Sequence, residues 1–195
     1  MSLIKPGTGY WDSKYSELVI PTLPFWYDYG FTPNDLTTFG FLATGGMLYN
    51  YWFNNPKVAI ALLLIRMYFD SADGLLARKY KLSSEFGDVY DHFVDAVFGI
   101  GMLIITYKAF PKTYRTKAIA ALLISYLLMS TQMSCMDIEC GEKCTHNTTL
   151  KVLSPLGFMC GGGMSTIFSF LDVVVLYGVC IGVILARDNV TVTKT

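Results

Sequence analysis

The chain has 195 residues, of which 53% are hydrophobic and 15% are charged, and its formal net charge is zero. A mean hydropathy of +0.43 is too high for an ordinary soluble domain, so the composition predicts a membrane protein. The length allows several membrane spans but excludes a second large domain. The neutral charge balance excludes the basic footprint of a nucleic-acid-binding protein.

Residues 1–30 are polar and aromatic, and residues 1–15 contain no apolar run typical of a secretory signal. We expect them to form an interfacial arm in the lipid headgroup layer. A membrane catalytic domain is expected at residues 31–188 and a short tail at residues 189–195. The first span is expected at about residues 32–53, with Thr32 or Asn34 as its cap and Pro33 in its first turn.

Five further spans are predicted, which gives an all-α, polytopic membrane protein with six transmembrane helices. The second, third and fourth spans are expected at about residues 57–77, 84–107 and 118–136. The apolar stretch from 150 to 186 is too long for one span. Pro155 and the glycines at 161–163 divide it into a short fifth helix and a sixth helix from about Ser165.

Six spans place both chain ends, the 78–83 turn and the 137–149 loop on one side of the membrane. That side carries 9 Lys and Arg residues against 5 on the other, although the basic 108–117 loop opposes the bias. The positive-inside rule therefore favours a cytoplasmic active site, in the endoplasmic reticulum or a bacterial-type inner membrane. Glycosylation sequons at Asn147 and Asn189 fall on the same side, so we expect neither to be used.

The five cysteines predict no disulfide framework, because their number is odd and no secretory signal is present. Cys160 and Cys180 lie in apolar runs, where we expect them to act as small hydrophobic residues. One loop gathers four possible zinc ligands, but their spacing matches no common zinc pattern. Reduced thiols are therefore expected in this loop, which contains Cys135, Cys140, Cys144 and His146.

Four aspartates lie at helical spacing around the 78–83 turn. Asp70 and Asp73 are three residues apart in the second span, and Asp91 and Asp95 are four apart in the third. Each pair shares one helix face, and an antiparallel hairpin brings both pairs to a similar depth. Converging carboxylates in an apolar chain repel one another, so protons or cations must neutralise them. Hard divalent cations with oxygen ligands suit this donor set.

The spacing resembles, position for position, the signature of the CDP-alcohol phosphotransferases, which are integral membrane enzymes of phospholipid synthesis. In this chain it reads Asp70-x2-Asp73-Gly74-x2-Ala77-Arg78-x8-Gly87-x3-Asp91-x3-Asp95. The resemblance implies that an alcohol attacks the β-phosphorus of a CDP-linked donor and CMP leaves, with two Mg²⁺ or Mn²⁺ ions at the diphosphate. It implies that Asp95 is also the general base. The implied metal ligands are Asp70, Asp73, Asp91 and Asp95.

The resemblance also implies a set of nucleotide contacts. Gly74, Ala77 and Gly87 would let the cytidine approach closely, although small residues equally favour packing between membrane helices. Arg78 would contact phosphate oxygens, with an interfacial anchor as its alternative role. Ser84 matches a nucleotide contact in relatives, and it is also placed to cap a helix. Asn34, in a stretch that resembles the family's first-helix opening, has the same two interpretations.

The motif does not determine which CDP-linked donor and which acceptor alcohol the protein uses. The stretches Ser84–Gly87 and Asp95–Gly99 look like enzymes that use serine. His92 instead looks like the branch that combines CDP-choline or CDP-ethanolamine with diacylglycerol, in which this histidine is a proposed base. Phe93 and Asp88 depart from that branch. The compact chain favours CDP-diacylglycerol as donor and a small alcohol such as inositol, serine or glycerol phosphate as acceptor. A non-catalytic membrane scaffold is the other alternative, and the family also suggests a homodimer.

Two charged residues lie inside predicted spans. Arg66 precedes Asp70 by one helical turn on the same face. Because charges within a membrane usually pair or serve function, we expect Arg66 to pair with a carboxylate or to bind a lipid phosphate. Asp172 is expected to bind the acceptor alcohol or to pair with Arg66.

Overall fold

The computed structural model describes residues 3–4, 8–140, 160 and 167–192, and this part is helical without strands. Short elements open it: α1 (Tyr10–Val19), the 3-10 turn η1 (Ile20–Thr22) and α2 (Leu23–Asp28). Five longer helices follow: α3 (Pro33–Trp52), α4 (Pro56–Tyr80), α5 (Glu85–Ala109), α6 (Lys112–Cys140) and α8 (Val173–Val192). The predicted all-α class is confirmed.

Local signals set the ends of the helices that carry the aspartates. Thr32 caps α3 through a reciprocal pair of hydrogen bonds with Asp35, which satisfies two otherwise unpaired N–H groups. The α4 helix ends where Lys81 adopts a left-handed conformation, with φ of 59°. The Ser84 hydroxyl then accepts a hydrogen bond from the Gly87 N–H at 3.0 Å and starts α5. The α4–α5 hairpin is therefore fixed on both sides of its turn.

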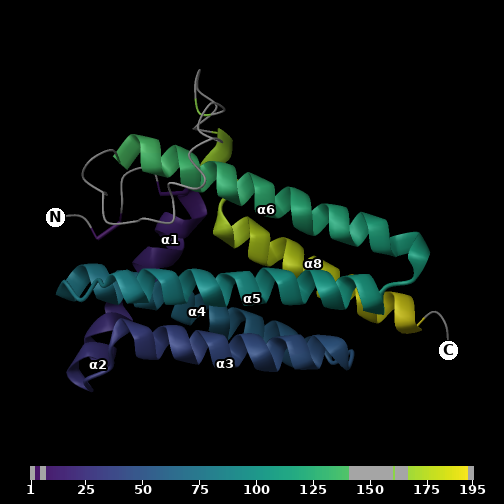
Figure 1. The fold of residues 1–195 in the computed structure, drawn as a ribbon, viewed down its shortest axis with the longest axis horizontal. Coiled ribbons are helices and arrows are strands. Elements are labelled where there is room, and N and C mark those ends of the chain that lie inside the picture. The colour runs from purple at the N-terminus through teal and green to yellow at the C-terminus, as the bar shows by residue number, and fades with distance from the viewer. Residues whose placement is uncertain (1–2, 5–7, 141–159, 161–166, 193–195) are drawn as a thin grey trace.

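Each long helix runs in the direction opposite to the long helix before it (Figure 1). The closest pair is α3 and α4, α5 packs on α3, and α6 and α8 pack on each other above them. One apolar core joins α3, α4, α5 and α8, and Tyr51, Leu63, Met102 and Ile184 are almost fully buried in it. The basic segment 112–117, expected as a loop, belongs to α6, because helix formation begins directly after Pro111.

The N-terminal arm packs against the end of the bundle that holds the α4–α5 turn. Val19 and Leu23 are buried against Leu75 and Leu76 of α4. At the same place, the Tyr68 hydroxyl accepts a hydrogen bond from the indole Nε1 of Trp26 at 2.7 Å. The arm is therefore part of the folded unit at this end of the molecule.

Asp172 connects this arm to α8. Its carboxylate accepts hydrogen bonds from the backbone N–H of Asp12 at 2.9 Å and from that of Val174 at 3.2 Å. The second bond caps the first turn of α8. Asp172 is 1% exposed and does not reach Arg66, so the predicted ion pair between them is wrong. Both oxygens of this buried carboxylate accept backbone N–H groups, and binding of the acceptor alcohol by Asp172 stays a prediction.

The neighbouring Asp12 makes the stability of the arm depend on pH. Burial, followed by the charges of Asp172 and Asp70, raises the pKa of Asp12 from 3.8 to about 7. Between these values the folded protein binds more protons than the unfolded chain, so its stability falls as the pH rises. We expect Asp12→Asn to lose less thermal stability than the wild type between pH 5 and pH 8, measured in detergent with EDTA. Glu17→Gln on the exposed face of α1 is the control and should retain the wild-type difference. An unchanged loss in Asp12→Asn would contradict this assignment.

The six-span topology is not confirmed. Among the described helices, α5 and the Lys112–Met136 part of α6 are long and apolar enough to cross a membrane. The expectation that both chain ends share one side is wrong, because α8 ends at the far end of the bundle from α1 (Figure 1). There Arg187 donates a hydrogen bond to the Trp52 carbonyl at 2.7 Å. Asn189 lies at this end, so its sequon is not on the side of the α4–α5 turn.

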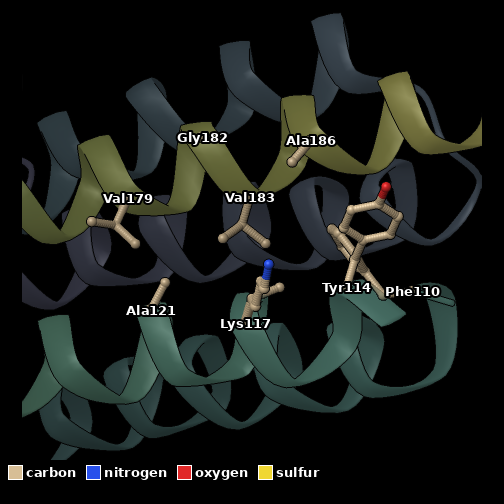
Figure 2. Close-up of a pocket in the computed structure, with 9 residues that line it drawn as sticks. Phe110, Tyr114, Lys117, Ala121, Val179, Gly182, Val183 and Ala186 are labelled. Atoms are coloured by element: carbon tan, nitrogen blue, oxygen red, sulfur yellow. The ribbon is translucent and has the colours of Figure 1, made fainter. Parts of the chain in front are cut away.

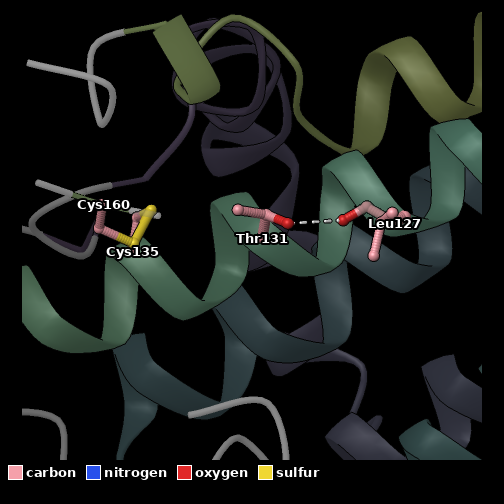
Figure 3. Close-up of a disulfide and its surroundings, with 4 residues drawn as sticks. All are labelled: Leu127, Thr131, Cys135 and Cys160. Carbon is pink, nitrogen blue, oxygen red and sulfur yellow. Dashed lines mark hydrogen bonds between the residues drawn. A yellow bond between two sulfur atoms is a disulfide. The ribbon is translucent and has the colours of Figure 1, made fainter. Parts of the chain in front are cut away.

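A disulfide joins Cys135 of α6 to Cys160 (Figure 3). The expectation of reduced thiols is wrong for this pair, since the fold brings residue 160 back to the end of α6. The disulfide also excludes Cys135 as a zinc ligand. Cys144 and His146 lie outside the described residues. Cys180 is buried and free, as predicted. Disulfides are rare in the cytosol, and this one lies at the end of the bundle that was expected to face it.

An apolar cavity of about 340 Å³ lies between α6 and α8 (Figure 2). Its lining residues Phe110, Tyr114 and Lys117 lie around the start of α6, which is the end of the bundle far from the α4–α5 turn. None of the predicted site residues lines it. Its lining residues are Phe110, Tyr114, Lys117, Ala118, Ala121, Val179, Gly182, Val183 and Ala186.

Candidate metal centre

Three of the four predicted aspartates converge between α4 and α5. Asp70, Asp91 and Asp95 each offer a carboxylate oxygen, and these three oxygens lie within 4.8 Å of one another. The spacing of the residues explains this, because Asp91 and Asp95 share one face of α5 and Asp70 lies on the facing side of α4. The Asp95 side chain is 41% exposed, and that of Asp70 is 23% exposed.

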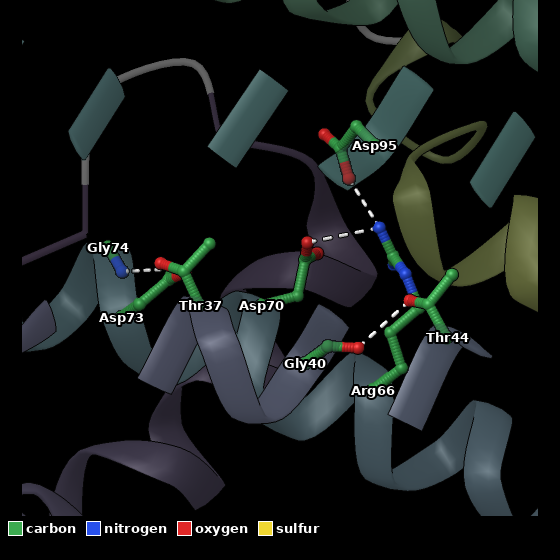
Figure 4. Close-up of polar contacts among 8 residues, drawn as sticks. All are labelled: Thr37, Gly40, Thr44, Arg66, Asp70, Asp73, Gly74 and Asp95. Atoms are coloured by element: carbon green, nitrogen blue, oxygen red, sulfur yellow. Dashed lines mark hydrogen bonds and ion pairs between the residues drawn. The ribbon is translucent and has the colours of Figure 1, made fainter. Parts of the chain in front are cut away.

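Asp73 lies beside this group but is oriented by other partners. Its Oδ2 accepts a hydrogen bond from the Thr37 hydroxyl of α3 at 2.6 Å, and its Oδ1 accepts one from the Gly74 N–H at 2.5 Å (Figure 4). Thr37 and Asp73 are both buried. Sequence reasoning did not assign this role to Thr37. Its position three residues after Asn34, on the same face of α3, was the available signal.

Arg66 contacts the group from α4. Its Nη2 atom forms a hydrogen bond with Asp95 Oδ1 and lies 3.4 Å from Asp70 Oδ1 (Figure 4). The expected pairing of Arg66 with a carboxylate is therefore confirmed.

The donor set of this centre fits a hard divalent cation. It offers carboxylate oxygens from two helices, and Mg²⁺ and Mn²⁺ prefer such ligands in proteins. Three carboxylates with one arginine leave a formal charge of −2 when all are ionised. Asp70, Asp91 and Asp95 would hold the cation, with Asp73 adjacent.

The predicted nucleotide residues form a second group next to this centre. A Cβ added to Gly87 of α5 would lie 2.9 Å from the Asn34 Oδ1 of α3 and 3.0 Å from the Ser84 Oγ. Asn34, Ser84 and Gly87 are therefore in close contact, although they come from two helices. Ser84 also caps α5, so its capping role is confirmed and a nucleotide contact remains a prediction.

Gly74 and Arg78 form the part of this group on α4. A Cβ added to Gly74 would lie 3.2 Å from Arg78 Nη1, so the guanidinium folds back over the glycine. The Arg78 Nε donates a hydrogen bond to the Leu3 carbonyl at 3.2 Å. Ala77 lies at the last turn, where its carbonyl accepts the Leu82 N–H. All three therefore lie at the α4 end nearest the turn.

His92 is not part of the carboxylate group. Its Nδ1 lies 2.7 Å from the carbonyl oxygen of Asp88 in the preceding turn of α5, a distance that fits an N–H donor. His92 is three residues before Asp95, but its ring nitrogens are not among the ligand atoms that lie within 4.8 Å of one another in this group. The role of His92 as a base stays a prediction.

The contact at Gly87 can be tested by adding a single methyl group. Gly87→Ala would push Asn34 away, because 2.9 Å is too short for a carbon–oxygen contact. If these residues hold the nucleotide, kcat/KM for a CDP-linked donor should fall about tenfold or more, chiefly through KM, because small displacements in a binding site are costly. Gly45→Ala of α3, where no atom lies within 4 Å, is the matched control. A lower melting temperature with unchanged KM would assign Gly87 to packing alone.

Comparison with known proteins agrees with this geometry. The family model for CDP-alcohol phosphatidyltransferase matches residues 31–185. An uncharacterized protein of Aquifex aeolicus is 38% identical over 81 residues, which is 42% of this chain and 41% of that protein. The archaetidylinositol phosphate synthase of Pyrococcus horikoshii is 35% identical over 74 residues, 38% of this chain and 39% of the synthase. The matches thus span about two fifths of these relatives, and no solved structure matches significantly.

The family model covers most of the chain, including α3, α4 and α5 with the carboxylate group between them. The chain therefore belongs to the CDP-alcohol phosphatidyltransferase family.

Proposed function

We propose that this protein is a membrane enzyme of phospholipid synthesis. It transfers a phosphatidyl group from a CDP-linked donor, CDP-diacylglycerol in our proposal, to a small alcohol and releases CMP. The observation that carries the proposal is the convergence of Asp70, Asp91 and Asp95 within 4.8 Å, in a chain of this family. Two divalent cations, Mg²⁺ or Mn²⁺, would supply charge stabilisation at the diphosphate when bound.

The residues of the chain divide this task between two groups. Asn34, Ser84 and Gly87, together with Gly74, Ala77 and Arg78 at the turn, would hold the cytidine diphosphate part of the donor. Arg78 carries a guanidinium, whose donors suit phosphate oxygens. The four aspartates lie deeper, where they would hold the cations beside the reacting phosphate.

Asp95 is the proposed general base. As the new O–P bond forms, the alcohol proton passes to the Asp95 carboxylate, and the bond between the β-phosphorus and CMP breaks. Its side chain is 41% exposed, so an alcohol can reach it. Arg66 bonds one of its oxygens, which leaves the other oxygen for the proton.

CDP-diacylglycerol is favoured over a soluble CDP-aminoalcohol for two reasons. The relative from Pyrococcus horikoshii is named an archaetidylinositol phosphate synthase, which places a phosphorylated inositol in its lipid product. The alternative branch would use His92, which lies outside the carboxylate group and contacts the Asp88 carbonyl of its own helix. We therefore place inositol phosphate beside inositol, serine and glycerol 3-phosphate among the acceptors.

The test is CMP release by the purified protein in detergent with Mn²⁺ or Mg²⁺. CDP-diacylglycerol is combined with each of the four acceptors, and CDP-choline and CDP-ethanolamine are combined with diacylglycerol. CMP in one pair of the first set, lost on addition of EDTA, would support the proposal. CMP in the second set alone would overturn the choice of donor and favour His92 as base. No CMP in any pair, and no thermal stabilisation by Mn²⁺ plus a CDP compound, would favour a scaffold.

A further inference from the structure

Arg66 is a buried cation inside the carboxylate group. Its side chain is 2% exposed, and it lies on α4 one turn before Asp70. One nitrogen, Nη2, contacts both Asp70 and Asp95 (Figure 4). Arg66 therefore already pairs with two of the three carboxylates that would hold a divalent cation.

Two aromatic rings fix the position of this guanidinium. Its Cζ lies 4.2 Å from the ring centre of Phe98 on α5 and 5.5 Å from that of Tyr177 on α8. A cation over an aromatic face is attracted by the ring electrons, and more strongly in a buried place. The Arg66 Nε has no hydrogen-bond partner among the described residues. The guanidinium thus contacts two ring faces and two carboxylates.

A divalent cation that binds Asp70 and Asp95 must share these oxygens with Arg66. Two cations at one carboxylate repel each other, and a buried site screens this repulsion poorly. The arginine also supports the fold without metal, since it keeps facing carboxylates from being left uncompensated.

We propose that Arg66 is a resident counter-cation that competes with the divalent cation for Asp70 and Asp95, and so sets the metal affinity of the site. Arg66 is in this sense a positioning residue, which holds Asp95 toward Asp70 until metal arrives. The inference rests on the proposed function only in taking the aspartates as metal ligands. It concerns metal binding and needs no substrate.

The test is Mn²⁺ binding to the substrate-free protein, followed by electron paramagnetic resonance of free Mn²⁺. We expect Arg66→Gln and Arg66→Met to lower the Kd for Mn²⁺ about tenfold or more, because a repelling charge is removed at close range. Arg66→Lys keeps a charge and should remain nearer to the wild type. Arg187→Gln is the matched control and should leave the Kd unchanged. Arg187 is also a buried arginine beside a ring, that of Tyr51, but lies at the other end of the bundle.

The outcomes separate this inference from the proposed function. Equal or weaker Mn²⁺ binding in both uncharged variants would overturn the competition while leaving the metal site intact. Absence of Mn²⁺ binding in every protein would overturn both. If the uncharged variants do not fold, the test is made on the wild-type protein by recording the ¹⁵N resonances of its guanidinium groups. The Arg66 signal is assigned as the one that is absent from Arg66→Lys. A shift of that signal on addition of Mg²⁺ supports competition, and an unchanged signal at saturating Mg²⁺ overturns it.

Discussion

Replacing Asp95 with asparagine is expected to abolish CMP release while the protein stays folded. Asparagine has nearly the same shape, and its carbonyl oxygen can still accept the hydrogen bond that Arg66 donates to Asp95. An amide cannot take up the alcohol proton, however, and it is a weaker metal ligand than a carboxylate. We expect kcat to fall about 10³-fold or more, since loss of a positioned base alone typically costs 10²- to 10⁴-fold. The measurement is CMP release at saturating donor and acceptor.

Two comparisons make the Asp95→Asn result specific. Asp88→Asn lies on the same helix, outside the carboxylate group, and should keep activity near that of the wild type. Melting temperatures in detergent would show whether each variant is folded. Substantial turnover by folded Asp95→Asn would move the base to another residue, with His92 as the next candidate.

The sequence predicted the α4–α5 hairpin well because its determinants are local. Helical spacing alone places Asp70 opposite the pair on α5, and Ser84 and Lys81 define the two sides of the turn. The expected range of 84–107 for the third span differs from Glu85–Ala109 by a residue or two. Local signals of this kind need no knowledge of the rest of the fold.

Contacts between distant segments could not be predicted from the sequence. Arg66 was expected to pair with a carboxylate or to bind a lipid phosphate, and its contact with Asp95 depends on how α4 and α5 rotate against each other. Asp172 looked like a functional charge because nothing in the sequence places the backbone of Asp12 next to it. The Cys135–Cys160 disulfide likewise depends on where the chain returns after α6. Each is a matter of tertiary packing, which spacing along one helix does not determine.

The expected direction of α8 was wrong for a related reason. Counting apolar stretches assumes that each one crosses the membrane, and six crossings return the chain to its starting side. In the structure, α6 ends and α8 begins at the same end of the bundle, and the Asn54 side chain donates a hydrogen bond to Asp188 at the other end. Arg187 therefore lies at the end opposite the α4–α5 turn, and the excess of Lys and Arg that favoured a cytoplasmic active site becomes smaller.

Thr37→Val should impair the enzyme through Asp73 without removing any metal ligand. Valine has the shape of threonine but no hydroxyl, so Asp73 would lose the hydrogen bond of 2.6 Å that orients its Oδ2. Loss of a partner that orients a metal ligand typically costs about 10- to 100-fold in metal affinity or activity, and we expect a fall in that range. Thr37→Ser keeps the hydroxyl and should restore most of the activity.

The matched control for Thr37→Val is Thr44→Val on the same helix. Thr44 is also buried, but its hydroxyl bonds the Gly40 carbonyl within α3 and contacts no aspartate (Figure 4). The Thr37 hydroxyl also bonds a carbonyl of its own helix, that of Pro33, as the Thr44 hydroxyl bonds that of Gly40. Both valine variants therefore lose one buried hydroxyl and should lose similar thermal stability. Only Thr37→Val should also weaken Mn²⁺ binding and slow CMP release. If Thr44→Val were equally inactive, the loss would reflect the stability of α3, and the orientation of Asp73 by Thr37 would have no separate part in the reaction.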